Sequence, residues 1–347
     1  MAGNGKFRIG VSDGITPETF PHVDLSPIKN DPNIEIDLIK EGTELKPEDV
    51  ENLDGLVLLL NKITPATFHP NGRLSVIARM GVGYDTIDVP ACTKNGVALC
   101  ITPDAVRRPV AVAVMTFLLA LTTKLFKMDE ITRGGPAIWP QRTQHWGVGL
   151  VGRTFGLVGI GNIGADVARL LKPFDMRLIG YDPYIDPAKA KELGIELKGL
   201  EDVFREADVV SVHTPLTPET RGIVNAERLA LMKPTAYLIN TSRGPVVDQK
   251  ALTKVLQNRA IAGAGLDVLE KEPPEADDPI LKLDNVILAP HALCWTDQCF
   301  GTMGDLDVAA MYDVMHGREP RVIVNRDVLE NQAWRAKLNA YRETFGG

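Results

Sequence analysis

Three ionisable side chains stand just after strand-like runs in the last third of the chain. Arg243 follows AYLINTS, Glu272 follows GAGLDVLEK and His291 follows NVILAP. An imidazole exchanges protons near neutral pH, a carboxylate beside it orients the ring, and a guanidinium binds a carboxylate through two hydrogen bonds. Taken one at a time, Arg243 can be an ion-pair partner, Glu272 a solvated loop acid and His291 a core histidine. Together they indicate acid–base chemistry on a substrate that carries a carboxylate.

A glycine-rich segment supplies a candidate cofactor site. The stretch GLVGIGNIGADVARLLKPF places Gly159, Gly161 and Gly164 between a strand-like run and an apolar helix pattern. In that context the first glycine permits a tight turn, the second lets the backbone approach a pyrophosphate, and the third lets helix and strand pack closely. The alternative is a merely flexible turn. The context favours dinucleotide binding.

Two aspartates follow later strands. Asp182 ends MRLIGYD, where a carboxylate accepts ribose hydroxyls and repels a 2'-phosphate, so NAD is expected rather than NADP. Asp182 and Pro183 also suit a turn, and both roles are compatible. Asp267 closes the strand before Glu272 and is a candidate contact for the nicotinamide carboxamide. Hydride transfer to a 2-keto acid needs a proton at the carbonyl oxygen, which the three side chains described above can supply.

The surrounding pattern predicts an α/β protein with two doubly wound parallel sheets. Strand-like runs alternate with helical patterns through the first hundred residues, and the alternation restarts near Thr154. The first set of runs is KFRIGV, IEIDLI, GLVLLL, LSVIAR and VALC. The second set is TFGLVG, MRLIGY, VVSVH, AYLIN, IAGAGLDV and NVILA. A long apolar helix, PVAVAVMTFLLALTTKLFKMDE, and an irregular stretch rich in Gly, Pro and Trp lie between the two sets.

The composition narrows the class of protein. The chain has 347 residues, 44% hydrophobic and 24% charged, with a net charge of -7 and no basic stripe. Neither nucleic acid nor membrane is therefore an expected partner, and the longest apolar run is broken by Thr116. The N-terminus lacks the apolar core of a signal peptide, and the four cysteines have no paired spacing. A reducing cytoplasm and no metal site are expected.

Several longer motifs resemble the D-isomer-specific 2-hydroxyacid dehydrogenases over nearly the whole chain. They are ARMGVGYDTIDVPACTKNGV, TFGLVGIGNIG, VVSVHTPLTPETRGIVN, MKPTAYLINTSRGPVVD, AGAGLDVLEKEPP and LAPH. The resemblance implies an NAD-dependent enzyme that interconverts 2-keto acids and D-2-hydroxy acids. It makes His291 the acid–base residue, Glu272 its partner and Arg243 the substrate anchor. It also implies that the backbone amides of Val82 and Gly83 bind the substrate carboxylate.

The same resemblance implies the domain organisation. A Rossmann NAD-binding domain at 105–293 would be inserted into a flavodoxin-like substrate domain formed by 1–104 and 294–347. A homodimer is implied as well, held partly by an arm from Trp139 to Val148. The residues implied as cofactor contacts are Gly159, Gly161, Asn162, Ile163, Gly164, Asp182, Thr214, Pro215, Thr220, Thr241 and Asp267.

Some positions depart from the family pattern. Val112 and Ala113 stand where Ala-Glu-His is common, and Leu293, Cys294 and Trp295 follow the histidine in place of small residues. Two alternatives of other classes stay open: an NAD-sensing scaffold like the C-terminal-binding-protein corepressors, and a phosphoglycerate dehydrogenase without a regulatory domain. A formate dehydrogenase relative is disfavoured, because that group replaces the glutamate partner.

The substrate itself is predicted from one strand. Phosphoglycerate dehydrogenases, which this family includes, carry two substrate-facing arginines where Leu58 and Leu60 stand here. Leucines cannot pair a phosphate dianion, and burying one against them costs several kcal/mol. A small unphosphorylated 2-keto acid is therefore expected, such as glyoxylate, hydroxypyruvate or a longer homologue, with Trp295 near its side chain. The alternative is that Leu58 and Leu60 are only strand core and that Arg107 or Arg108 supplies the charge.

Overall fold

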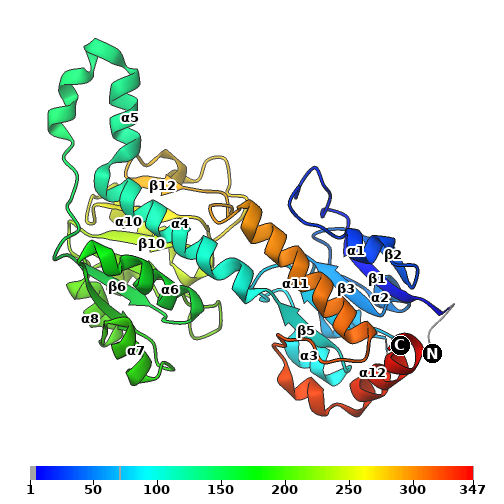
Figure 1. The fold of residues 1–347 in the computed structure, drawn as a ribbon. Coiled ribbons are helices and arrows are strands. Elements are labelled where there is room, and N and C mark those ends of the chain that lie inside the picture. The colour runs from blue at the N-terminus through cyan, green and yellow to red at the C-terminus, as the bar shows by residue number, and fades with distance from the viewer. Residues whose placement is uncertain (1–4, 70–71, 347) are drawn as a thin grey trace. The chain divides into compact units, whose positions relative to one another are not determined.

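The computed structural model describes residues 5–69 and 72–346. It divides into two compact units, drawn in Figure 1. Unit 1 combines the described residues up to Val106 with those from Trp295 onward, and unit 2 is Arg107–Cys294. The boundaries fall at 106/107 and 294/295, where the sequence predicted 104/105 and 293/294.

Unit 1 contains a five-stranded sheet in the order β2-β1-β3-β4-β5, and every neighbouring pair is parallel. This is the flavodoxin-like order. Its strands coincide with the first set of predicted runs, at β1 (Phe7–Ser12), β2 (Ile34–Ile39), β3 (Gly55–Leu58), β4 (Val76–Arg79) and β5 (Ala98–Ile101). Its helices are α1 (Ser26–Asn30), α2 (Pro47–Val50), α3 (Val89–Lys94), α11 (Asp297–Met315) and α12 (Gln332–Phe345).

Unit 2 contains a seven-stranded sheet in the order β12-β11-β10-β9-β6-β7-β8, again with parallel pairs throughout. The strands are β6 (Thr154–Val158), β7 (Arg177–Tyr181), β8 (Ile195–Leu197), β9 (Val209–Val212), β10 (Tyr237–Asn240), β11 (Gly263–Leu266) and β12 (Val286–Leu288). The strand order reverses between β6 and β9, the crevice in which doubly wound sheets bind dinucleotides. The sequence prediction missed β8, because only Ile195 of its three residues is buried.

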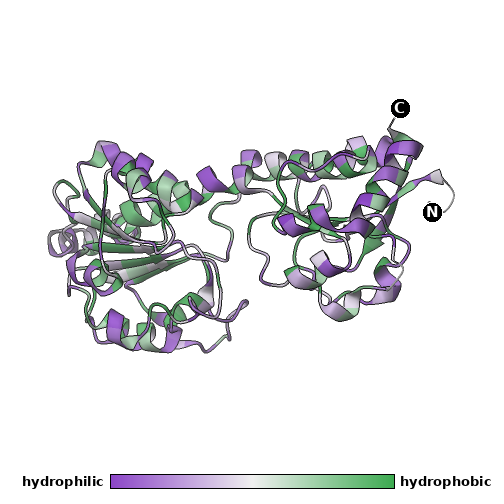
Figure 2. Ribbon diagram, turned by 90° about the horizontal axis from the view of Figure 1, so that it is seen from below, coloured by the Kyte–Doolittle hydropathy of each residue, from purple (hydrophilic) through white to green (hydrophobic). Residues whose placement is uncertain are grey.

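Helices cover both faces of the unit 2 sheet. Residues of α4 and α6 pack on one face, and residues of α8, α9 and α10 pack on the other. The bounds are α4 (Pro103–Thr123), α5 (Leu125–Arg133), α6 (Asn162–Leu171), α7 (Pro187–Leu193), α8 (Leu200–Glu206), α9 (Ala226–Leu229) and α10 (Gln249–Gln257). In Figure 2 the strands are mostly green, that is hydrophobic, whereas the helices alternate in colour. That contrast is expected for parallel strands buried on both faces and helices buried on one.

The predicted long helix is in fact two helices. Lys124 adopts a left-handed conformation with φ of 55°, which ends α4 and begins α5. α4 is long and apolar enough to cross a membrane, but two thirds of its most apolar window is buried, with Val114, Phe117 and Leu118 in the core. α5 and the segment after it project from unit 2 as an arm (Figure 1).

Short 3-10 helices complete the described structure. They are η2 (Pro65–Thr67), η3 (Gly135–Ala137), η4 (Trp139–Gln144), η5 (Lys172–Phe174), η6 (Gly244–Val246), η7 (Pro279–Lys282) and η8 (Arg326–Glu330). The predicted irregular stretch after α5 therefore consists of η3, η4 and the extended chain leading to β6.

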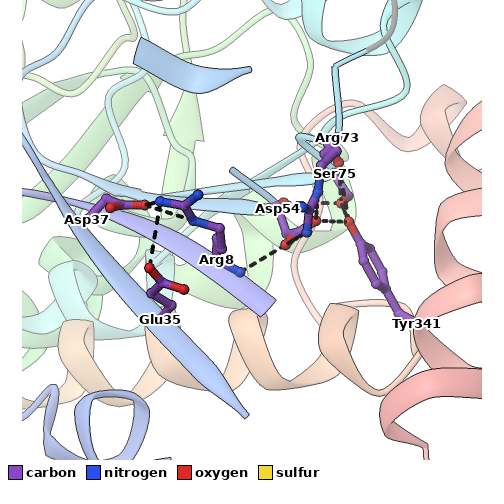
Figure 3. Close-up of polar contacts among 7 residues, drawn as sticks. All are labelled: Arg8, Glu35, Asp37, Asp54, Arg73, Ser75 and Tyr341. Carbon is purple, nitrogen blue, oxygen red and sulfur yellow. Dashed lines mark hydrogen bonds and ion pairs between the residues drawn. The ribbon is translucent and has the colours of Figure 1, made fainter. Parts of the chain in front are cut away.

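A buried polar cluster attaches the C-terminal helix to unit 1 (Figure 3). Asp54 is 1% exposed and accepts hydrogen bonds from Arg73, at 2.6 and 3.0 Å, and from the hydroxyl of Tyr341 in α12, at 2.7 Å. The backbone amide of Arg8 also donates to Asp54, at 2.8 Å, and Ser75 and Tyr341 share a hydrogen bond of 2.8 Å. A buried carboxylate needs such partners. The two ends of the chain therefore form one folded unit.

Candidate active site

The glycine-rich turn connects β6 to α6 in unit 2. Gly159 has φ of +93°, and a β-carbon there would lie 3.0 Å from the backbone of His213. A β-carbon at Gly164 would lie 2.4 Å from the carbonyl oxygen of Gly159, whereas the corresponding space at Gly161 is open. The N-cap of α6 is Gly161, and no side chain among the described residues caps this helix. Its first amide groups are therefore available to an anion such as the predicted pyrophosphate.

Asp182 follows β7 and is fixed by two backbone amides. Oδ2 accepts from the amide of Ile160 in the glycine-rich turn at 2.7 Å, and Oδ1 accepts from the amide of Tyr184 at 2.8 Å. The bond from the amide of Tyr184 closes a turn, so Asp182 also has the turn-forming role that the sequence suggested. An ionised carboxylate has about four acceptor sites, so both oxygens retain capacity for ribose hydroxyls.

His291 and Glu272 lie within hydrogen-bond distance at the carboxyl edge of the unit 2 sheet. Nδ1 of His291 is 2.8 Å from Oε2 of Glu272, and Oε1 of Glu272 accepts from the amide of Leu269 at 3.0 Å. An ionised carboxylate only accepts, so the hydrogen of this bond is on Nδ1. Nε2 is then the ring nitrogen left to accept a hydrogen bond. The imidazole side chain is 45% exposed, which is compatible with access to a ligand.

The backbone at His291 is unusual and is fixed by Asp267. His291 has φ of +56°, in the left-handed region that few non-glycine residues adopt. Its amide donates to the carbonyl of Asp267 at 2.7 Å, and the carboxylate of Asp267 accepts from the amides of Ala292 and Leu293 at 3.0 and 3.1 Å. Burial raises the pKa of Asp267, and the two amides offset part of that rise. Asp267 therefore orients the histidine turn, a role the sequence did not predict.

Glu272 stays ionised near neutral pH. Burial raises the pKa of Glu272, but the hydrogen bonds from His291 and Leu269 and the charge of Arg243 outweigh it and leave the pKa below its usual value. Arg243 follows β10, and its guanidinium donates to the carbonyl of Ser242 at 2.8 Å. The three side chains that the sequence singled out thus follow three adjacent strands, with His291 bonded to Glu272 and Arg243 near enough for its charge to lower the pKa of Glu272.

Other predicted cofactor residues have local roles. Thr220 donates to the carbonyl of Pro215 at 2.5 Å and accepts from the amide of Thr217 at 2.8 Å, so its hydroxyl shapes the loop after β9. The hydroxyls of Thr214 and Thr241 are shielded from solvent and have no hydrogen-bond partner among the described residues. Partnerless buried hydroxyls at this edge are compatible with a ligand that supplies the missing bonds. Asn162 and Ile163 form the first turn of α6.

His213 was missed by the sequence reasoning. It follows β9 and lies against the glycine-rich turn, with its ring 3.5 Å from where a β-carbon of Gly164 would be. The residue as a whole is partly exposed, but both ring nitrogens are shielded and lack a hydrogen-bond partner among the described residues. Burial lowers the pKa of His213 to about 3, so the ring is neutral. The sequence signal that could have indicated His213 is its position directly after the strand-like run VVSV, comparable to that of His291 after NVILAP.

The residues considered for substrate binding have different surroundings. In unit 1, Val82 and Gly83 follow β4 and are half-buried, Leu58 is 1% exposed and Leu60 is 58% exposed. Trp295 packs on Phe20 and Phe300 in unit 1, with ring centroids 5.5 and 5.2 Å away. In unit 2, Nε of Arg108 lies 2.9 Å from the carboxylate of Asp166, which is 1% exposed. Leu58 is therefore strand core, and Arg108 is the counter-charge of a buried aspartate.

Comparison with known proteins agrees with this geometry. Residues 115–292 match the D-isomer specific 2-hydroxyacid dehydrogenase, NAD binding domain, family. A glyoxylate reductase of Korarchaeum cryptofilum is 40% identical over 318 residues, which cover 90% of this chain and 95% of the relative.

Two solved structures are similar along nearly the whole chain. D-lactate dehydrogenase from Aquifex aeolicus, complexed with NAD and lactic acid, has a TM-score of 0.80 at 27% identity, covering 91% of this chain and 99% of that one. The NADPH-dependent glyoxylate/hydroxypyruvate reductase from Sinorhizobium meliloti has a TM-score of 0.79 at 29% identity, covering 93% and 98%. The resemblance seen in the sequence is thereby confirmed, and the chain belongs to the D-isomer-specific 2-hydroxyacid dehydrogenases.

Proposed function

We propose that this protein uses NAD to interconvert a small unphosphorylated 2-keto acid and the corresponding D-2-hydroxy acid, with His291 as the proton donor and acceptor. The observation that carries the proposal is the 2.8 Å hydrogen bond between Nδ1 of His291 and Glu272. It lies at the carboxyl edge of the sheet that carries the glycine-rich turn, the edge at which doubly wound sheets bind ligands.

The side chains divide the chemistry between them. When bound, the cofactor would supply the hydride as NADH in the reductive direction and accept it as NAD+ in the oxidative direction. In the reductive direction, Nε2 of His291 donates a proton to the carbonyl oxygen as negative charge develops there, and in the oxidative direction it removes the hydroxyl proton. Glu272 fixes the ring and stabilises its protonated form. Arg243 binds the substrate carboxylate and polarises the adjacent carbonyl.

The amides of Val82 and Gly83, which follow β4, are the proposed further contacts of the substrate carboxylate. Leu60 and Trp295 expose more than half of their surface, and neither can pair with a second anionic group on a substrate. Glyoxylate, hydroxypyruvate and longer aliphatic homologues are the proposed substrates, because none of them carries a second charge.

The cofactor is proposed to be NAD in preference to NADP. The Aquifex relative holds NAD and the Sinorhizobium relative is described as NADPH-dependent, so close folds use either cofactor. Asp182 favours NAD here, because its carboxylate is held beside the glycine-rich turn by the amide of Ile160. A 2'-phosphate placed against an ionised carboxylate is repelled.

A homodimer is proposed from the projecting arm. Phe126, Trp139 and Trp146 are 61%, 45% and 78% exposed, and all belong to the arm that begins with α5. Large apolar side chains exposed together mark a protein–protein interface. A reducing cytoplasm also remains the proposed compartment, because the four cysteines have no paired spacing in the sequence.

The first prediction concerns proton transfer. His291→Ala should lower turnover of glyoxylate with NADH by roughly two to four orders of magnitude, because the proton donor is lost. The dissociation constant of NADH, measured by fluorescence titration, should stay unchanged. His22→Ala removes an exposed histidine of unit 1 and should leave both quantities unaltered. Near-normal turnover by His291→Ala would mean that this histidine is structural.

A second prediction concerns the pH profile. Because the pKa of Glu272 lies below its usual value, the carboxylate is charged throughout the neutral range, 2.8 Å from the imidazole. Glu272→Gln removes that charge, so the high-pH limit of keto-acid reduction should move down by about one pH unit. Steady-state rates measured between pH 5 and 9 would show the shift. An unmoved limit contradicts the pairing.

The cofactor prediction uses Asp182. The wild type should prefer NADH to NADPH by about two orders of magnitude in kcat/KM. Asp182→Asn keeps an acceptor for the amide of Ile160 but removes the charge, so it should narrow the preference with little loss of NADH binding. Equal use of both cofactors by the wild type is incompatible with the proposed role of Asp182.

The substrate prediction compares two keto acids at fixed NADH. Because Leu58 is core, Leu60 is apolar and Arg108 is paired with Asp166, hydroxypyruvate should have at least about a tenfold higher kcat/KM than 3-phosphohydroxypyruvate. A preference for the phosphorylated compound would show that the phosphate finds cations elsewhere.

A further inference from the structure

The loop after β4 has a tightly determined backbone. Gly81 has φ of +121°, a conformation that side chains of L-residues rarely adopt. Its amide donates to the hydroxyl of Thr102 at 2.9 Å, and the amide of Thr102 donates to the carbonyl of Gly81 at 2.9 Å. Thr102 is 1% exposed. Gly81 is therefore fixed on one side by the residue that follows β5.

Arg79 occupies the other side of Gly81. A β-carbon at Gly81 would lie 1.8 Å from one guanidinium nitrogen of Arg79 and 3.0 Å from its Cζ. The same nitrogen donates to the carbonyl of Met80 at 2.8 Å. The side chain of Arg79 thus turns back along the loop that follows its own strand. Any side chain at position 81 would have to displace the guanidinium.

Asp307 relates this arginine to the C-terminal part of the chain. It belongs to α11, which packs on β4, and it is 1% exposed. Burial raises the pKa of Asp307 well above its usual range, and the charge of Arg79 opposes that rise. One carboxylate oxygen, Oδ2, has no hydrogen-bond partner among the described residues. Burial therefore favours the neutral form of Asp307, which lies in the helix that packs on the strand of Arg79.

We propose that Arg79 is a positioning residue for the substrate carboxylate, because its guanidinium holds the backbone at Met80 and Gly81, directly before Val82 and Gly83. The inference rests on the proposed function, in which the amides of Val82 and Gly83 bind that carboxylate. By holding Met80 and Gly81, the guanidinium sets the direction of the two amides that follow, and it adds a positive charge to the same loop. Both effects strengthen binding of an anion without any direct contact between Arg79 and the substrate.

The experiment compares steady-state constants for glyoxylate in Arg79→Met and Arg79→Lys. Arg79→Met should raise KM by about ten- to a hundredfold, because the amides lose their fixed direction and their supporting charge. Arg79→Lys keeps the charge and should recover part of the loss. The kcat value should change less than KM, and the dissociation constant of NADH should stay within about twofold.

Arg73→Met is the matched control. Arg73 is also an arginine of unit 1, and it pairs with Asp54, which is 1% exposed. Arg73 and Asp54 belong to the cluster around Tyr341 (Figure 3). Replacement of Arg73 should lower stability and leave KM unchanged. Equal KM values for the Arg79 variants and the wild type, or equal increases in the Arg79 and Arg73 variants, would overturn the proposal.

Two further measurements keep the outcomes separate. If Arg79→Met does not fold, the positioning role is tested with Arg79→Lys and Gly81→Ala. The second variant is informative because a β-carbon at position 81 displaces the guanidinium of Arg79. Both variants should then raise KM, and an unchanged KM in both refutes the positioning role. Failure of the proposed function looks different, since the wild type itself would not reduce glyoxylate or its homologues while still binding NADH.

Discussion

The proposed chemistry depends on the parallel alignment of three neighbouring strands. In the sheet of unit 2, Asn240 pairs with Leu266, and Leu266 pairs with Leu288, so β10, β11 and β12 end in one row. Residues placed shortly after those ends must meet at one edge, although long stretches of sequence separate them. The hydrogen bond between His291 and Glu272 is a consequence of that alignment. A shift of one strand by a single residue would turn its side chains to the other face and separate the pair.

The sequence was most informative where apolar runs were long. All the strands of unit 1, and all those of unit 2 apart from β8, coincide with predicted runs, because strands buried on both faces need continuous β-branched and aliphatic residues. β8 has a single buried residue and so left no comparable pattern. The break at Lys124 was also missed. A lysine in the left-handed conformation has no sequence signature of the kind that glycine provides.

At the candidate active site, the residues themselves could be predicted from the sequence, but the hydrogen bonds that hold them could not. The acidic, basic and glycine residues could be located because each stands at a strand end. That Asp267 fixes the turn of His291, or that Thr220 closes its own loop, depends on backbone amides whose positions follow only from the folded structure. His213 shows the same limit. A histidine without hydrogen-bond partners becomes notable only when its surroundings are known to be closed to water.

The cluster around Asp54 has a consequence for the order of events during synthesis. Ser75 and Tyr341 share a hydrogen bond across 266 positions of sequence, so unit 1 begins before unit 2 in the chain and is completed after it. Unit 2 is continuous, and all of its residues have been synthesised once Cys294 has been added. Until α12 has been synthesised, Asp54 and Arg73 lack the hydroxyl of Tyr341 that completes their cluster. An insertion that splits one domain thus allows the inserted domain to be complete first, and unit 1 is complete only when α12 has been added.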